Sequence, residues 1–202
     1  MLNKAFFARH AALVAPELIG VVLTIGDAGG IIVETEAYDE ADPASHTFNG
    51  PTPRNLAMFG PPGHAYVYRS YGIHWCLNFV CGVEGVGEAV LIRAIEPTRG
   101  LDVMRERRGG IADIHKLCSG PGRLCQALGV DREFDRLPLD TLPFRLAAGA
   151  RPPAVATGVR VGLTKGAETA WRFGWPGSRF LSRRFPPVPV TSVPSAARTA
   201  LR

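Results

Sequence analysis

Residues 31–38 have the sequence IIVETEAY, in which a continuous β-branched run is followed by an alternating part. β-Branched residues favour strands, and a period of two indicates a strand with two different faces. We therefore predict a β-strand that runs from the core to a surface cleft. Glu34 and Glu36 would share one face of it. A solvated strand face is the simplest interpretation of such a pair, and a pair of carboxylates for acid–base chemistry is the alternative.

The segments on either side of this strand also have clear patterns. Residues 10–19 predict a short amphipathic helix that ends at Gly20, and residues 21–24 begin a strand that a turn at 27–30 joins to 31–38. Residues 39–62 are rich in Pro, Gly, Asn and Asp and predict a long irregular connection. Such loops often contain functional residues, and this one contains His46. With Glu36 and Tyr38, His46 could form a pocket for a purine.

Residues 64–80 have a dense aromatic β pattern that is interrupted at Ser70, Tyr71 and Gly72. This pattern predicts a β-hairpin with Tyr71 at or near its tip. An exposed aromatic residue is unusual there, and one use is insertion between base pairs beside a flipped nucleotide. An ordinary cross-strand aromatic ladder is the alternative.

The rest of the chain predicts a mixture of short elements. We expect a strand at 89–94, a helix at 97–108, a helix from about Arg123, a loop-rich region at 131–153, a strand at 155–163 and a frayed segment after Pro186. Gly120 and its neighbours before the second helix could bind an anion with their amides. Four arginines are candidates for phosphate contacts or active-site electrostatics: Arg54, Arg69, Arg93 and Arg99.

The composition of the 202 residues limits the classes of function. A hydrophobic content of 46% permits a buried core, and a net charge of +5 favours an anionic partner such as nucleic acid or a membrane surface. A GC-rich genome could equally explain the excess of arginine. The four cysteines form no C-x-x-C pair, so we predict reduced, buried thiols and no metal site. We find no targeting segment and expect an intracellular, soluble protein.

Several motifs together resemble the 3-methyladenine (alkyladenine) DNA glycosylase family. They agree in order and spacing from about residue 18 to residue 177: IVETEAY at 32–38, His46, TPRN at 52–55, MF at 58–59, YVY at 66–68, YG at 71–72, LN at 77–78, LIRA at 91–94, EP at 96–97, LCSGP at 117–121, LCQAL at 124–128 and RVG at 160–162. The loop after Tyr38 is shorter than in mammalian relatives, His74 replaces an aromatic residue, and 131–150 match poorly. These departures leave the lesion preference open.

The resemblance implies a role for each matching position. It implies that Glu36 is the general base and that Arg93 helps to hold the water. The implied base pocket contains Tyr38, His46, Tyr68, Asn78, Leu91 and Val161. Tyr71 would intercalate into DNA with Ile73 beside it, and Arg54 is our candidate for a phosphate contact.

The resemblance implies a monofunctional DNA glycosylase that removes damaged purines from double-stranded DNA in base-excision repair. We expect no cofactor, no membrane association, a monomer, and a cytoplasmic location, associated with the nucleoid if bacterial. We expect an α+β fold: a single compact domain with a curved, mostly antiparallel β-sheet, surrounding helices and a protruding β-hairpin. Residues 1–190 would form the catalytic domain and 191–202 a frayed tail. A non-catalytic damaged-DNA-binding module and a carbohydrate glycosidase that uses Glu34 and Glu36 are the alternatives.

Overall fold

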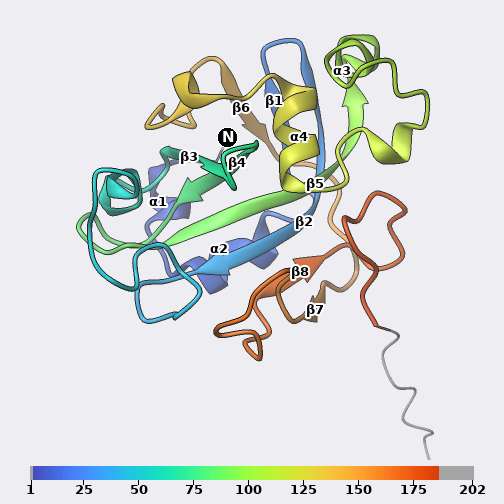
Figure 1. The fold of residues 1–202 in the computed structure, drawn as a ribbon. Coiled ribbons are helices and arrows are strands. Elements are labelled where there is room, and N and C mark those ends of the chain that lie inside the picture. The colour runs from blue at the N-terminus through green and yellow to red at the C-terminus, as the bar shows by residue number, and fades with distance from the viewer. Residues whose placement is uncertain (1, 187–202) are drawn as a thin grey trace, which may run out of the picture.

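Two long antiparallel strands, β2 (Ala28–Tyr38) and β5 (Ala89–Arg99), run side by side through the centre of the protein (Figure 1). The structure is a computed structural model that describes residues 2–186. Within these residues the sheet has eight strands, and its main path has the order β3-β4-β5-β2-β1-β6. The other strands are β1 (Val22–Ile25), β3 (Ala65–Ser70), β4 (His74–Val80), β6 (Phe144–Ala147), β7 (Ala156–Gly158) and β8 (Arg172–Gly174).

The pairing of β2 explains how one strand serves both the core and a cleft. One edge of β2 pairs with β5 along its length, whereas the other edge pairs first with β1 and then with β8 at Glu34–Glu36. The register with β5 shifts three times, and such bulges bend and twist a strand. At Gly30 an added Cβ would lie 2.0 Å from the carbonyl oxygen of Glu96, so only glycine permits this close approach.

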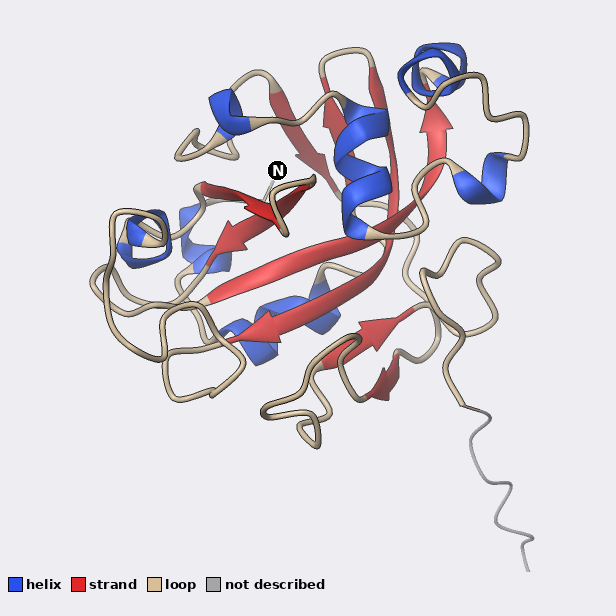
Figure 2. Ribbon diagram, viewed as in Figure 1, coloured by secondary structure: helices blue, strands red, loops and turns tan. Residues whose placement is uncertain are grey.

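Short helices cover the sheet (Figure 2). Helix α2 (Ala11–Glu17) packs against β2 and β5, where the Thr35 hydroxyl donates to the Ala15 carbonyl oxygen at 2.9 Å. Helix α4 (Pro121–Leu128) packs against β4 and β5, with proline at its start and Gly129 in the left-handed conformation at its end. The remaining helices are α1 (Lys4–Phe7), α3 (Leu101–Arg107), η1 (Leu56–Phe59), η2 (Ile114–Lys116) and η3 (Arg132–Phe134).

These elements confirm the predicted α+β domain with a curved antiparallel sheet, and they correct several boundaries. Residues 28–30 belong to β2 rather than to a turn, because the turn is at residues 26–27. Residues 97–99 continue β5, so the helix predicted there begins only at Leu101. The region predicted as loop contains β6, and β8 was not predicted at all. The predicted tail, 191–202, lies outside the described residues.

The hairpin of β3 and β4 has the predicted tip. Its strands pair from Ala65 with Phe79 to Ser70 with His74, which leaves residues 71–73 as the connecting loop. Tyr71 has a positive φ of 50° and 90% of its surface is exposed. A bulky residue rarely adopts this backbone conformation, and strain of this kind often occurs at functional sites. The tip therefore presents an aromatic ring directly to solvent.

Candidate active site

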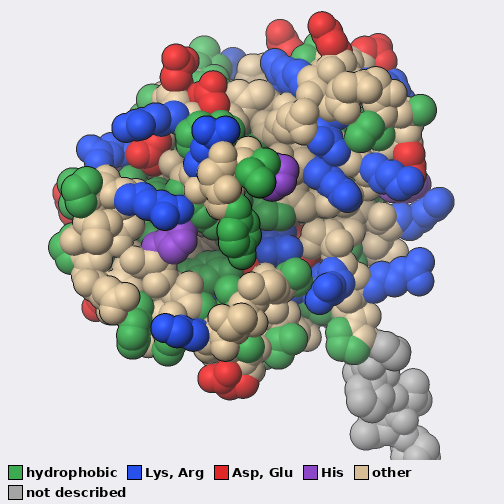
Figure 3. Space-filling model, viewed as in Figure 1, with side chains coloured by type: hydrophobic (Ala, Val, Ile, Leu, Met, Phe, Trp, Pro, Cys, Tyr) green, Lys and Arg blue, Asp and Glu red, His purple; other side chains and the backbone are tan. Residues whose placement is uncertain are grey.

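A cavity of about 800 Å³ opens beside the hairpin tip, between the sheet and the long loop after β2. On this face of the molecule, Lys and Arg side chains gather around the hollow, and most acidic side chains lie toward the outer edge (Figure 3). The cavity is lined by residues from distant parts of the chain: Tyr38, Ala44, His46, Arg54, Met58, Tyr66, Tyr68, Arg69, Ser70, Tyr71, Gly72, Cys76, Asn78, Leu91, Arg93, Pro121, Val161, Gly162 and Leu163.

Glu36 lies on β2 beside this cavity, and its carboxylate accepts three hydrogen bonds. The Val161 backbone N–H donates to Oε1 at 2.7 Å, while the Tyr38 hydroxyl and Arg93 Nη1 donate to Oε2 at 2.8 and 3.0 Å. A carboxylate offers about four lone-pair positions, so one position on Oε1 can still accept a hydrogen bond. Glu36 has no exposed surface and does not itself line the cavity, whereas its three donors, Tyr38, Arg93 and Val161, all do.

Glu34 is also fully buried, and Arg93 Nε donates to its Oε1 at 3.0 Å. The interpretation of Glu34 and Glu36 as a solvated strand face is therefore wrong. A carboxylate is buried only at high cost unless cations and hydrogen bonds compensate for its lost hydration. Arg93 contacts both carboxylates and supplies part of that compensation.

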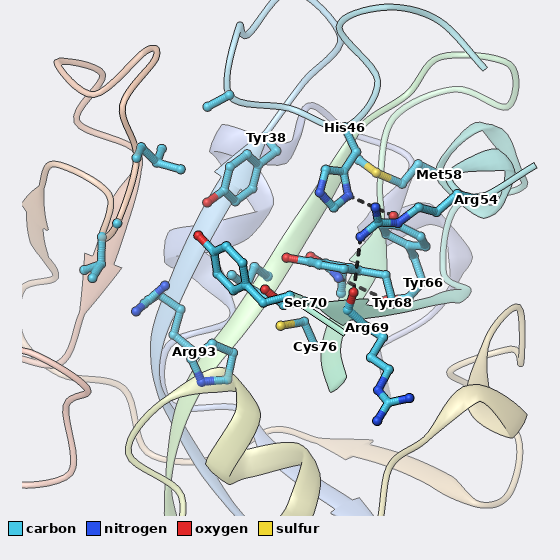
Figure 4. Close-up of a pocket in the computed structure, with 18 of the residues that line it drawn as sticks. Tyr38, His46, Arg54, Met58, Tyr66, Tyr68, Arg69, Ser70, Cys76 and Arg93 are labelled. Carbon is cyan, nitrogen blue, oxygen red and sulfur yellow. Dashed lines mark hydrogen bonds between the residues drawn. The ribbon is translucent and has the colours of Figure 1, made fainter. Parts of the chain in front are cut away.

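Three aromatic rings converge on the cavity from different elements (Figure 4). Tyr38 ends β2, His46 lies in the loop that follows, and Tyr68 projects from β3. The His46 and Tyr68 ring centroids are 4.5 Å apart with an edge-on geometry, and Tyr66 stacks on Tyr68 at 5.4 Å. Tyr66 and Tyr68 both belong to β3, and their partners across the hairpin are Asn78 and Cys76, so these two stacked rings line the cavity without forming the cross-strand aromatic ladder of the alternative.

Electrostatics keep these polar rings uncharged. Burial raises the pKa of Tyr38, and the Glu36 carboxylate raises it further, so the phenol remains a hydrogen-bond donor. Removal from bulk water lowers the pKa of His46, and nearby Arg54 lowers it further. A hydrogen bond of 2.9 Å joins His46 Nδ1 and the Tyr66 hydroxyl, and the tautomer of His46 decides which of the two groups donates.

Three other expected site residues, Asn78, Leu91 and Arg54, also line the cavity. Asn78 donates from Nδ2 to the Tyr66 carbonyl oxygen at 3.0 Å, which fixes its amide, and it pairs with Leu91 across β4 and β5. Arg54 lies on the rim and donates to the Arg69 carbonyl oxygen at 3.1 Å. The exposed side chain of Ile73 follows Tyr71 in the hairpin loop but does not line the cavity.

Sequence reasoning missed the buried pair of Arg160 and Asp42. Arg160 forms an ion pair with Asp42, donates to the Ala37 carbonyl oxygen at 3.0 Å, and lies 4.6 Å from the centroid of the Tyr38 ring. Arg160 thereby joins β2, the following loop and the segment that contains Val161. Arg160 was part of a matched motif, whereas no sequence pattern indicated Asp42.

The described residues were also searched for metal sites, disulfide bonds and membrane-spanning helices. Between residues 2 and 186, no group of three or more His, Cys, Asp or Glu side chains could hold a metal ion. All four cysteines are free and buried, as predicted. None of the helices in this part of the chain is long and apolar enough to span a bilayer.

Comparisons with known proteins agree with this geometry. The family model "Methylpurine-DNA glycosylase" matches residues 5–179. A protein of Rhodopseudomonas palustris is 58% identical over 186 residues, which cover 92% of this chain and 90% of the relative. A Bradyrhizobium diazoefficiens protein is 56% identical over 185 residues (92% of each chain), and a Nitrosospira multiformis protein is 58% identical over 179 residues (89% of this chain, 92% of the relative). All three are named "Putative 3-methyladenine DNA glycosylase".

The match covers the strand of Glu36, the aromatic hairpin and Val161, and hence the whole wall of the cavity. The chain therefore belongs to the methylpurine-DNA glycosylase family, whose members are N-glycosyl hydrolases that act on DNA in base-excision repair.

Proposed function

We propose that this glycosylase flips alkylated or deaminated purines out of duplex DNA and hydrolyses the N-glycosidic bond with a water molecule that Glu36 activates. The observation that supports this most directly is the Glu36 carboxylate beside the cavity, held by three donors with one lone pair left free. A carboxylate so fixed can act only where a substrate brings water and the reacting carbon next to it.

In the proposed step, a water molecule donates to the free lone pair of Glu36 Oε1 and its oxygen attacks C1′ of the flipped nucleotide. The C1′–N bond breaks, its electron pair leaves with the purine, and the proton passes to Glu36. An alkylated purine is already cationic and leaves as a neutral base, whereas a neutral lesion needs a proton or a hydrogen bond on the leaving base. Arg93 stabilises the charge of Glu36 until the proton arrives.

The proposed pocket selects for purines by shape and stacking. A flipped base would lie between Tyr38 on one side and His46 with Tyr68 on the other. Asn78, whose amide is fixed by Tyr66, would crowd the amino group of an undamaged guanine. Leu91 and the backbone of Val161 complete the enclosure of the reacting end.

The exposed tip supplies the proposed wedge. Tyr71 would enter the space that the flipped base leaves, Ile73 would pack beside it, and Arg54 would contact a phosphate at the rim. Extrusion of a base costs a few kcal/mol, and stacking of about 1–3 kcal/mol per aromatic ring can offset it. We propose that the protein does this as a monomer on double-stranded DNA.

Excision from defined duplexes tests the proposal. Duplexes that each contain 3-methyladenine, hypoxanthine, ethenoadenine or 7-methylguanine should release the free base and retain an abasic site. Borohydride should trap no covalent adduct, because lysine does not line the cavity. Tight binding of all four duplexes with no release of any base would favour a damage-binding module and contradict the proposed reaction.

A further inference from the structure

A cluster of buried charges lies behind Glu36, on the side of β2 where β8 pairs. Glu34 Oε1 accepts from Arg93 Nε at 3.0 Å, from Arg172 Nε at 2.8 Å and from the Ser182 hydroxyl at 2.7 Å. The Ser182 backbone N–H donates to the other oxygen of Glu34 at 2.5 Å. Glu34 therefore accepts four hydrogen bonds, one more than Glu36, and has no exposed surface.

The charges within this cluster balance. Glu34 and Glu36 contribute two negative charges, and Arg93 and Arg172 contribute two positive ones. Without Arg172, the single charge of Arg93 would be divided between two buried carboxylates. Because Arg172 is paired with Glu34, the Nη1 of Arg93 remains available for Glu36.

Ser182 completes the set of contacts around Arg93. Its hydroxyl oxygen accepts from Arg93 Nη2 at 3.1 Å while its proton is donated to Glu34. Each guanidinium nitrogen of Arg93 therefore has a partner: Glu34 for Nε, Glu36 for Nη1 and Ser182 for Nη2. A planar guanidinium with three fixed contacts can neither rotate nor slide away from Glu36.

The segment that contains Ser182 is attached to the sheet next to this cluster. Arg172 on β8 donates to the Arg183 carbonyl oxygen, and its guanidinium lies 4.0 Å from the centroid of the Phe185 ring. At Gly174 an added Cβ would lie 2.3 Å from the same ring, so Phe185 packs directly on the strand. Ser182 lies beyond residue 179, the last one that the family model matches.

We propose that Ser182 and Glu34 are positioning residues that hold Arg93 in register with Glu36, and that the segment after β8 thereby forms part of the catalytic apparatus. This inference rests on the roles proposed above for Glu36 and Arg93. It predicts a change in the rate of the chemical step without a matching change in DNA affinity, because neither residue lines the cavity.

The test compares Ser182→Ala with Ser178→Ala in single-turnover excision at saturating enzyme. Ser178 lies in the same segment, and within residues 2–186 its hydroxyl accepts only from the Phe180 backbone N–H, at 3.2 Å. Ser182→Ala should slow excision roughly 10-fold, the loss expected for one hydrogen bond to a charged group. DNA affinity should stay unchanged, Ser178→Ala should excise at the wild-type rate, and Ser182→Thr, which keeps the hydroxyl, should restore most of the rate.

A wild-type rate for Ser182→Ala, or a loss that weaker DNA binding fully explains, would contradict the inference. If Ser182→Ala does not fold, Arg172→Lys gives the same comparison, because lysine keeps the positive charge but cannot reproduce the contacts to Glu34 and Arg183. That variant should also lose rate and keep affinity, and a wild-type rate would again contradict the inference.

Glu36→Gln in the same assay separates the two proposals. Full activity of Glu36→Gln would remove the proposed mechanism, whereas an inactive Glu36→Gln with a fully active Ser182→Ala would remove only the positioning role.

Discussion

Replacement of Tyr71 by alanine should impair base flipping and leave the folded protein intact. The ring is 90% exposed, so it contributes little apolar burial to folding. The positive φ of 50° at this position is equally unfavourable for tyrosine and alanine, so the backbone cost does not change. The variant therefore separates the function of the ring from the stability of the hairpin.

The size of the effect follows from stacking. An aromatic ring stacked on a base contributes about 1–3 kcal/mol, and the loss of this amount shifts an equilibrium roughly 5- to 150-fold. The population of flipped nucleotide should fall by that factor in Tyr71→Ala. Tyr71→Phe keeps the ring and should behave like the wild-type protein, since no hydrogen bond from the Tyr71 hydroxyl stabilises the described part of the fold.

Fluorescence of ethenoadenine in a duplex provides the assay, because the signal of this base changes when it leaves the stack. Wild-type protein and Tyr71→Phe should give the same change on binding, and Tyr71→Ala should need far more protein or fail to reach it. The melting temperatures of all three should agree closely. A full signal change with Tyr71→Ala at wild-type concentration would refute the role of Tyr71 as a wedge.

Three further predictions concern the pocket and the rim. Asn78→Ala removes the amide that crowds guanine, so excision of undamaged guanine should rise relative to hypoxanthine; an unchanged ratio would contradict this. His46 has a pKa below its usual value of 6.5, so its ring is neutral at pH 7 and becomes protonated only as the pH falls below that value. Affinity for a duplex with a cationic lesion should therefore weaken between pH 7 and pH 5, and His46→Gln should lose that part of the dependence. Arg54→Ala should reduce the slope of log affinity against log salt by about 0.9, and an unchanged slope would exclude a phosphate contact.

Local patterns predicted the parts of the fold that depend on neighbouring residues. The alternation in 31–38 and the aromatic run in 64–80 each describe one continuous strand or hairpin, and both elements are present. The tip at Tyr71 was predictable because the interruption of the pattern lies within the hairpin itself. The motifs of the resemblance supplied the rest of the cavity wall, which brings together residues from distant parts of the chain.

Elements that depend on distant partners were not predictable in this way. Strand β8 has only three residues, and it forms by backbone pairing with β2 and β7, of which β2 lies far away in the sequence. Gly29 and Gly30 suggested a turn, yet they lie in β2, where Gly29 packs closely on Leu23 and Thr24 of β1 and Gly30 on the Glu96 carbonyl of β5. Pro97 suggested a helix start, but it pairs with Gly30 inside β5, next to a register shift, and the pairing continues to Arg99.

The most direct test of the mechanism is single-turnover excision by Glu36→Gln, measured together with its DNA affinity and melting temperature. Glutamine has the same shape but must direct its NH₂ group either at the Val161 N–H or at Tyr38 and Arg93, and it cannot take a proton from water. The account predicts normal DNA binding with excision slower by about 10²-fold or more. Excision at the wild-type rate by the folded variant would mean that another group activates the water.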